Sequence, residues 1–286
     1  MKKILGFVLM LSTPIFTYAQ DWHVGLIGGI SNYSGDLNEK RVDFRYTRPM
    51  VGLMVKKDMN RFLTLRGGFS FGMIAGADST NESLALVARN LSFRSPIWEG
   101  QLGAELNILD IDDKGFTPYI FAGVSLFSFY PTTRDSLGNK IALRRLSTEG
   151  QGLPQYPERG NQYALHQVSI PFGVGFKYIF TEKLTLGIET GLRATFTDYL
   201  DDVSTTYVDQ NTLLAERGQA AVDFSYRGDE TNGDKVIPNP NYPLDGAQRG
   251  SAKYKDWYIF TGFTIMYRIG GGSSGRPTNF SRCPRM

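Results

Sequence analysis

Apolar side chains alternate with small or polar ones in eight stretches of this chain, each about ten or more residues long. In the segment 172–178, Phe172, Val174, Phe176 and Tyr178 alternate with two glycines and a lysine. A period of two residues predicts a β-strand with one apolar and one polar face. The expected strands cover residues 22–31, 49–57, 62–74, 91–109, 116–130, 165–180, 184–196 and 256–269.

The connections between these segments alternate in length. Short turns occupy residues 58–61, 110–115 and 181–183, whereas long polar loops occupy residues 32–48, 75–90, 131–164 and 197–255. Outer-membrane β-barrels have an even number of strands, short periplasmic turns and long outer loops. We therefore predict an all-β fold, an eight-stranded antiparallel transmembrane β-barrel of the outer membrane, with both chain ends on the periplasmic side.

The alternation also assigns side chains to the lipid or the lumen. The residues expected to face lipid are Leu63, Leu65, Phe69, Phe71, Met73, Trp98, Leu102, Ala104, Leu106, Ile108, Leu184, Leu186, Ile188, Leu192 and Phe196. Those expected to face the lumen are Thr64, Arg66, Ser70, Glu99, Gln101, Gly103, Glu105, Asn107, Thr185, Gly187, Glu189, Gly191, Arg193 and Thr195. An arginine or lysine facing lipid at mid-bilayer costs about 2–4 kcal/mol. The charged residues avoid that face, which supports this register.

Charges of both signs are expected inside the barrel. They are Lys56, Arg66, Lys177, Arg193 and Arg268, with Glu99, Glu105 and Glu189. Such a set could form an ion path or proton site, or it could pair into a plug. An eight-stranded barrel is just wide enough for side chains to fill it, and buried charges pair with one another. The count of strands therefore favours the plug over a porin-like channel.

Aromatic residues gather at the ends of the expected strands, as in the girdles that anchor barrels at headgroup depth. Trp22, Phe62, Tyr119, Tyr178, Phe180 and Tyr267 are expected at the periplasmic interface. Tyr33, Tyr130, Phe196, Tyr199 and Trp257 are expected at the outer one.

The two ends of the chain fall outside the predicted barrel of residues 20–269. Residues 1–19 have a basic start, an apolar stretch and small residues at the end, which predicts a secretion signal. Residues 270–286 begin with a Gly/Ser-rich stretch typical of flexible linkers. This tail contains Cys283, the only cysteine, which could cross-link to a partner or be incidental. The tail itself could dock a periplasmic partner or remain disordered.

Charge and the remaining motifs give little indication of chemistry. Removal of Lys2 and Lys3 with the signal changes 31 basic residues to 29, against 28 acidic ones, so nothing favours a nucleic-acid partner. The acidic run 229–234 could hold calcium, but it lacks the full loop pattern and favours a solvated loop. The tripeptide 227–229 resembles an adhesion motif but is too short to be specific. We expect no cofactor and no metal.

A rim enzyme is the least favoured alternative. His166 lies at the outer end of an expected strand with Ser169 nearby, and His23 lies at the periplasmic end of the first strand. Nucleophilic catalysis needs a base oriented by a third group. The sequence supplies no third group at a recognisable spacing, so we expect no catalytic residues.

Several segments resemble a known family. They are Val24–Gly29, the stretch 33–37, the stretch 196–204, and Gln248-Arg249-Gly250 with 255–258. Over the whole mature chain the sequence resembles the PorG-like outer-membrane barrel component of the type IX secretion system. This resemblance implies a non-enzymatic barrel that contacts a periplasmic lipoprotein ring subunit and serves protein export for gliding motility or virulence. The open alternative is an independent small barrel whose outer loops bind a ligand or a surface.

Overall fold

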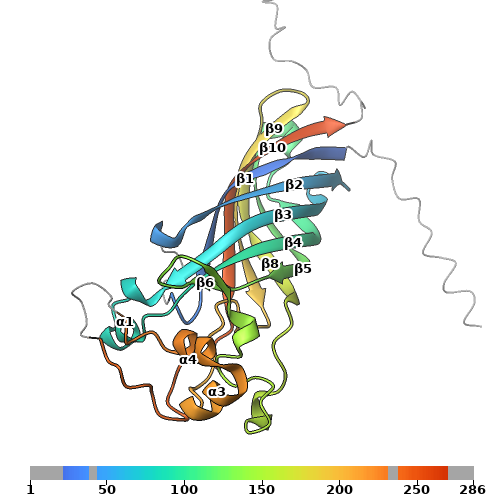
Figure 1. Ribbon diagram of the computed structural model, residues 1–286. Helices are drawn as coiled ribbons and strands as arrows, with labels where there is room; N and C mark the ends of the chain where they lie inside the picture. Colours follow the sequence, from blue (N-terminus) through green and yellow to red (C-terminus); the bar gives the residue numbers. More distant parts are fainter. Residues whose placement is uncertain (1–21, 39–43, 231–237, 270–286) are drawn as a thin grey trace, which may run out of the picture.

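The eight long strands close into one antiparallel barrel. The computed structural model describes residues 22–38, 44–230 and 238–269. The barrel strands are β1 (Trp22–Ser34), β2 (Arg48–Asp58), β3 (Leu63–Ala77), β4 (Ser92–Asn107), β5 (Phe116–Phe129), β8 (His166–Ile179), β9 (Leu184–Thr195) and β10 (Trp257–Ile269). Neighbours along this order pair antiparallel, and pairing of β10 with β1 completes the ring (Figure 1). The predicted fold is confirmed within these described residues.

The barrel exposes an apolar outer surface. Large apolar side chains point outward at every second position, and Leu102, Leu126 and Phe263 are each about 70 % exposed (69 %, 70 % and 68 %). The register predicted for residues 62–74, 91–109 and 184–196 is confirmed, because Thr64, Glu105 and Arg193 are buried on the inner face. An apolar band of this extent is unstable in water and is what a membrane-spanning barrel presents to lipid.

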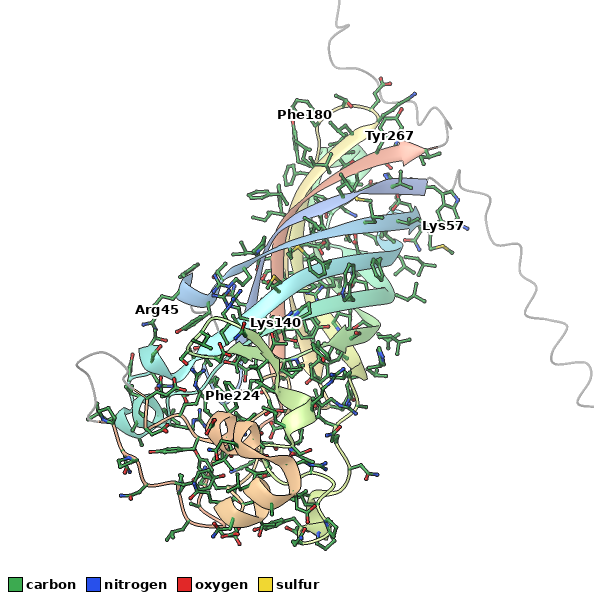
Figure 2. The ribbon with its side chains drawn as sticks, viewed as in Figure 1. Arg45, Lys57, Lys140, Phe180, Phe224 and Tyr267 are labelled. Carbon is green, nitrogen blue, oxygen red and sulfur yellow. The ribbon has the colours of Figure 1, made fainter. Side chains whose placement is uncertain are left out.

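One end of the barrel carries only tight turns. Asn60 closes the turn between β2 and β3, where its side chain accepts from the backbone N–H groups of Phe62 (2.9 Å) and Leu63 (2.8 Å). The turn between β4 and β5 contains the one-turn helix α2 (Ile111–Lys114). Asp110 caps that helix by accepting from the backbone N–H of Asp112 at 3.0 Å. Figure 2 places Phe180 and Tyr267 at this end.

The opposite end is covered by a folded cap made of the long loops (Figure 1). Its elements are η1 (Phe44–Tyr46), η2 (Asp78–Thr80), α1 (Leu84–Arg89), the hairpin β6 (Thr132–Arg134) and β7 (Lys140–Ala142), η3 (Leu143–Leu146), η4 (Pro157–Arg159), α3 (Gln210–Arg217) and α4 (Gln219–Ser225). Sequence periodicity predicted none of these. None of the described helices is long and apolar enough to cross a membrane.

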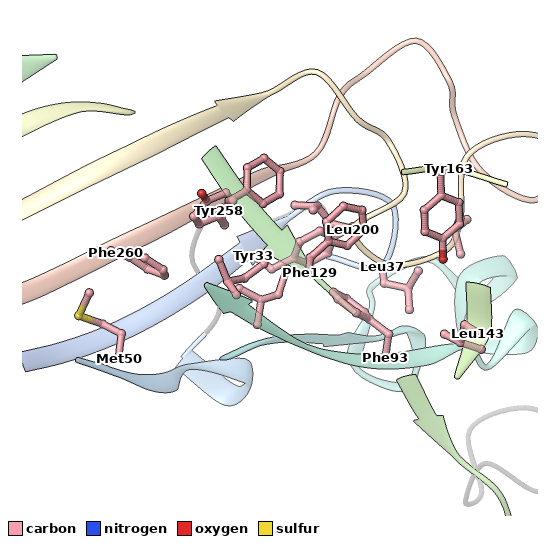
Figure 3. Packing of buried hydrophobic residues seen from close by; sticks show 14 of the residues in the cluster. Tyr33, Leu37, Met50, Phe93, Phe129, Leu143, Tyr163, Leu200, Tyr258 and Phe260 are labelled. Atoms are coloured by element: carbon pink, nitrogen blue, oxygen red, sulfur yellow. The ribbon is translucent and has the colours of Figure 1, made fainter. Parts of the chain in front are cut away.

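The hydrophobic core is concentrated in the outer half of the lumen and continues into the cap, with Met54 and Met266 extending it toward the short turns. Tyr33, Phe129, Leu200 and Tyr258 belong to this cluster, as Figure 3 shows. A second, smaller cluster lies within the cap around α3 and α4 and consists of Leu153, Val208, Leu213, Ala221 and Val222. The cap is therefore a packed structure of its own, anchored on aromatic side chains from the barrel interior.

The prediction that aromatic residues lie at the membrane interfaces is wrong for three residues. Tyr33 and Tyr119 are each only 1 % exposed and point into the barrel, because they share a face with the inward residues Ser31 and Thr117. Tyr199 also lies away from the lipid face, stacked on Tyr163 with ring centroids 4.8 Å apart. The exposed positions of Trp22, Phe62, Tyr178, Phe180, Tyr267 and Phe196 agree with the prediction.

Candidate functional site

A first layer of buried charges crosses the lumen near its middle. Arg66 on β3 donates two hydrogen bonds to Glu189 on β9, at 3.2 and 2.7 Å. The Tyr119 hydroxyl donates a third to the same carboxylate at 2.7 Å. The guanidinium of Arg66 also lies 4.1 Å from the centre of the Phe121 ring. Each charged group therefore meets an opposite charge or an aromatic face instead of water.

Glu105 on β4 forms ion pairs with three basic side chains from three other strands. Its carboxylate lies 2.5 Å from Lys56 Nζ, 3.2 Å from Lys177 Nζ and 3.2 Å from Arg66 Nη1. Glu105 itself has no exposed surface. The pairs with Lys56 on β2 and Lys177 on β8 tie β4 to strands that are not its neighbours in the sheet, whereas Arg66 lies on the adjacent strand β3.

A second charged layer lies nearer the cap. Arg193 donates to both oxygens of Glu99, at 3.1 and 3.2 Å, and the Tyr258 hydroxyl donates to the same carboxylate at 2.6 Å. The Arg193 guanidinium lies 4.5 Å from the centre of the Phe260 ring. Above this layer the lumen is filled by the aromatic core, so polar and apolar fillings follow each other along the barrel axis.

The lumen of the described barrel is therefore a paired plug, as the strand count indicated. One predicted member is wrong: Arg268 lies at the rim, where its Nη2 is 3.5 Å from Asp112 Oδ1 on the turn helix α2. Arg268 is close to the end of β10, beyond the level of the lumen carboxylates. Sequence alternation assigned the side of this residue but not its depth.

The end with the short turns opens into a mouth cavity of about 760 Å³. Lys56 and Lys177 from the plug form its floor, and the turns and strand ends form its walls. His23 Nε2 lies 2.8 Å from Asp58 Oδ2, and the Thr64 hydroxyl donates to the other oxygen of Asp58 at 2.6 Å. The remaining walls mix charged and apolar side chains, namely Arg61, Asp110, Asp112, Asp113, Arg268, Met59, Phe62, Ile111, Ile179 and Met266. Such a lining suits contact with a protein segment of mixed character.

Arg249 is the centre of the cap at the other end. Its guanidinium is buried and donates to Glu149 Oε1 at 2.8 Å, to the Asp202 carbonyl at 2.7 Å and to the Ser225 carbonyl at 3.1 Å. Burial beside the Glu149 carboxylate keeps Arg249 charged, because the attraction outweighs desolvation and its pKa is raised. One side chain thereby joins the loop after β9 to the loop after β5.

A second buried pair brings the loop after β3 into the same structure. Arg89 at the end of α1 donates to both oxygens of Asp78, each at 2.7 Å. Arg89 also donates to the backbone carbonyl of Arg249. Glu149 in turn accepts from the backbone N–H of Ser204 at 2.9 Å. Three of the four long loops, those after β3, β5 and β9, are therefore joined by the Arg249–Glu149 ion pair and by hydrogen bonds to backbone groups.

Burial raises the pKa of several carboxyl groups in the cap, among them Asp78, Asp201 and Asp256. Burial raises the pKa of Asp202 to about 6, although it accepts hydrogen bonds from Thr148 and Tyr163, each at 2.6 Å. Burial also raises the pKa of Asp198 to about 6, partly offset by a hydrogen bond of 2.7 Å from the Ser204 hydroxyl. From these pKa values we expect the stability of the cap to change at mildly acidic pH.

The histidine and serine of the rim-enzyme alternative are not brought together. His166 is exposed on the outer face of β8, whereas Ser169, three residues later, is buried on the inner face. Ser169 Oγ lies 2.6 Å from Ser125 Oγ and forms part of the lumen packing. Residues an odd number apart in a strand face opposite sides, so this pair is ruled out as a catalytic dyad.

The remaining sequence motifs are resolved only in part. Arg227 of the tripeptide pairs with Glu230, with nitrogen to oxygen distances of 2.9 and 2.7 Å. Residues 231–234 of the acidic run, the signal segment 1–19 and the tail 270–286 with Cys283 lie outside the described residues. Within the described ranges, histidine and acidic side chains do not group into sets of three or more that could hold a metal ion.

The closed ring, the apolar exterior and the polar plug together define a transmembrane β-barrel of the outer membrane, since a closed barrel satisfies every strand edge inside lipid. A family model described as a domain of unknown function, DUF6089, matches residues 2–137, slightly less than half of the chain. No curated protein matches the sequence.

Solved structures with a similar fold are small outer-membrane barrels. Neisserial surface protein A is 7 % identical, with 88 % of this chain and 100 % of that chain covered and a TM-score of 0.42. A major outer membrane protein from Thermus thermophilus is 12 % identical, with 88 % and 100 % covered and a TM-score of 0.40. Ail, the attachment invasion locus protein of Yersinia pestis, is 10 % identical, with 87 % and 97 % covered and a TM-score of 0.37.

Proposed function

We propose that this barrel is a non-enzymatic, partner-binding component of a type IX secretion system. In this role its periplasmic mouth contacts a subunit of the periplasmic lipoprotein ring, and its apolar band holds that contact at the outer membrane. The observation that carries the proposal is the combination of a plugged lumen with an open mouth cavity. A plugged barrel does not serve as a general pore, whereas the mouth offers a hollow of about 760 Å³ to the periplasm.

The chemistry of the mouth supports a protein partner. Both signs of charge surround it, with Arg61 68 % exposed and Asp112 50 % exposed on neighbouring turns. Phe62 stands beside them, 48 % exposed. Protein interfaces commonly combine an aromatic or aliphatic anchor with a charged rim. The short turns hold these groups on rigid strand ends, which keeps the surface preorganised.

The segments that resemble the secretion barrel supply residues at the centre of the cap. The stretch 196–204 supplies Asp202, and the segment 248–250 supplies Arg249, which together organise the cap. Their resemblance to the family therefore covers residues that build the outer loops. This supports common architecture with that family, and the secretion role follows as our proposal.

Deletion of the gene in its host tests the role. We expect secreted cargo to disappear from the medium while outer-membrane integrity, measured by detergent sensitivity, stays normal. Re-expression of the wild-type chain restores secretion. Normal secretion in the deletion strain would contradict the proposal.

Site-specific photo-crosslinking tests the contact. A photoreactive residue at Arg61, on the mouth, should capture a periplasmic lipoprotein in the intact host. The matched control carries the same residue at Leu137, which is 84 % exposed on the opposite end of the barrel. Capture of the same protein from both positions, or from neither, would argue against a mouth-specific contact.

An independent barrel whose outer loops bind a ligand is the second candidate. The folded cap favours it, because long loops with their own core are a common place for recognition. A deletion strain with normal secretion but altered surface binding would support this reading.

A further inference from the structure

A second cavity, of about 1150 Å³, lies where the cap meets the outside of the barrel. Its barrel side is formed by Phe172, Leu192, Trp257 and Ile259. Phe172 and Ile259 are the direct partners of Leu192 on the two adjacent strands, so these three side chains form one row across β8, β9 and β10. Trp257 meets Phe172 edge to face, with ring centroids 5.9 Å apart.

This row belongs to the lipid-facing surface of the barrel. Leu192 alternates with the buried residues Gly191 and Arg193, which point into the lumen. Ile259 is only 6 % exposed, whereas Phe263, further along the same face of β10, is 68 % exposed. The difference arises because the cap extends over the outer end of β10 and covers the strand from outside. The cavity is therefore continuous with the surface that contacts acyl chains.

The cap side of the cavity is mixed in character. Leu86, Tyr207, Tyr226, Pro243 and Tyr254 supply apolar and aromatic surface. The polar contributors include Asp36, Arg89, Arg249, Ser251 and Lys255. Most of these are engaged in the cap: Arg249 and Arg89 bind Glu149 and Asp78, and Asp36 accepts from the backbone N–H of Ser251 at 2.9 Å.

Lys255 differs from the other charged lining residues. It is exposed, and its Nζ donates to a backbone carbonyl, that of Ala252, at 3.3 Å. It lies two residues before Trp257, a residue type that favours the headgroup level of a membrane. Lys253 lies close by, with its Nζ 5.3 Å from the centre of the Tyr254 ring. Basic side chains at this depth suit a phosphate group of a membrane lipid.

We propose that this cavity binds a phosphorylated, acylated glycolipid of the outer leaflet, of the lipid A class. One acyl chain lies along the row of Phe172, Leu192 and Ile259. A headgroup phosphate pairs with Lys255, and sugar hydroxyls meet the amide and hydroxyl groups of the cap. A diacyl phospholipid shares the phosphate and acyl chemistry, but its small headgroup leaves the polar wall of the cap unused. The proposal does not depend on the secretion role.

Native mass spectrometry of the detergent-purified barrel with added diphosphoryl lipid A tests this site. We expect one bound lipid A that phosphatidylglycerol at equal concentration does not displace. Leu192→Trp, which fills the cavity from the lipid face, should weaken binding at least tenfold. Lys255→Gln should weaken it about three- to tenfold and remove the preference for diphosphoryl over dephosphorylated lipid A.

Matched controls separate the site from the general lipid surface. Leu53→Trp places the same side chain on the lipid face of β2, and Lys140→Gln removes an exposed lysine from the β6–β7 hairpin. Both should bind lipid A like the wild type. Equal binding by Leu192→Trp and Leu53→Trp would overturn the site. Equal displacement by phosphatidylglycerol would overturn the glycolipid assignment. Because Lys255 is exposed, Lys255→Gln keeps the test valid if the tryptophan variant fails to fold.

Discussion

Arg66 and Glu189 join opposite walls of the barrel through two hydrogen bonds of 3.2 and 2.7 Å. Their strands, β3 and β9, are separated by three strands in either direction around the ring. Backbone pairing connects only adjacent strands, so this ion pair braces the barrel across its diameter. Glu105 extends the brace to Lys56 and Lys177 on two further strands. The filling of the lumen is therefore also a scaffold that sets the cross-section of the barrel.

Breaking this brace should destabilise the barrel strongly. Removal of one partner from a buried ion pair typically costs about 3–5 kcal/mol, because the other charge is left buried and unpaired. We expect a loss of this size for Glu189→Ala, measured by urea unfolding in detergent or lipid vesicles. Glu182→Ala in the exposed turn between β8 and β9 is the control and should change stability by less than about 0.5 kcal/mol. A similar small change in Glu189→Ala would contradict the bracing role.

The plug should also prevent steady ion conduction. Two charged layers and an aromatic core occupy the lumen one after another, and eight-stranded barrels leave little space beyond their side chains. In planar lipid bilayers we expect no stable current steps from the wild-type protein. A folded sixteen-stranded porin, measured in the same bilayers, provides the positive control. Reproducible open channels from the purified wild-type chain would show that the plug rearranges.

The lipid-facing register predicts a position-specific cost for charge. Leu102 is 69 % exposed on the outer face of β4, and a lysine there should reduce the free energy of folding into lipid by about 2–4 kcal/mol. The control is Leu137→Lys, since Leu137 is 84 % exposed in the outer β6–β7 hairpin and should tolerate the charge. Folding into vesicles, followed by gel mobility without heating, measures both. Equal tolerance at the two positions would place Leu102 outside the bilayer.

The cap should lose stability as the pH rises from about 4 to about 6. Burial raises the pKa of Asp202 from its ordinary value of 3.8 to about 6, so the folded cap binds this proton more tightly than the unfolded chain. Protonation therefore favours the folded cap below pH 4, and this contribution falls through pH 6 and stays constant above it. With about 1.4 kcal/mol for each pKa unit, Asp202 accounts for a loss of up to roughly 3 kcal/mol.

Hydrogen exchange of amides 198–225, corrected for intrinsic rates and measured across this pH range, checks the dependence. Asp202→Asn should reduce this slope without abolishing it, because the amide does not ionise while Asp198 keeps its raised pKa. Asparagine also tolerates the left-handed backbone (φ 70°) at this position. Asp223→Asn, an exposed acid on α4, should leave the slope unchanged. An unaltered slope in Asp202→Asn would assign the pH dependence to other groups.

The residues that carry the family resemblance turn out to be organisers of the cap. Arg249 and Asp202 come from segments far apart in the chain, and their contact is a guanidinium to a backbone carbonyl at 2.7 Å. Sequence inspection could single out both segments as specific but could not show that they meet. Arg249 stands out in the sequence only as a charged residue in the loop segment Gln248-Arg249-Gly250. Nothing in the neighbouring sequence indicated that its side chain is buried.

Alternation of side chains by itself determined the strand count, the closed topology and the face of residues such as Leu102 and Glu105. This is because a strand in a barrel has only two sides, lipid and lumen, and their polarity differs at every residue. The depth of each side chain along the barrel axis, and the residue that it contacts, were decided only by tertiary structure. Arg268 was assigned to the wrong depth, since its closeness to Asp112 depends on strand stagger. Tyr119 was assigned to the wrong face although it alternates in register with the inward Thr117, and only the fold supplied its partner Glu189. Tertiary structure also decided the cap, because its loops are held together by contacts between distant segments, such as the buried Arg249–Glu149 ion pair. Such contacts leave no period in the sequence.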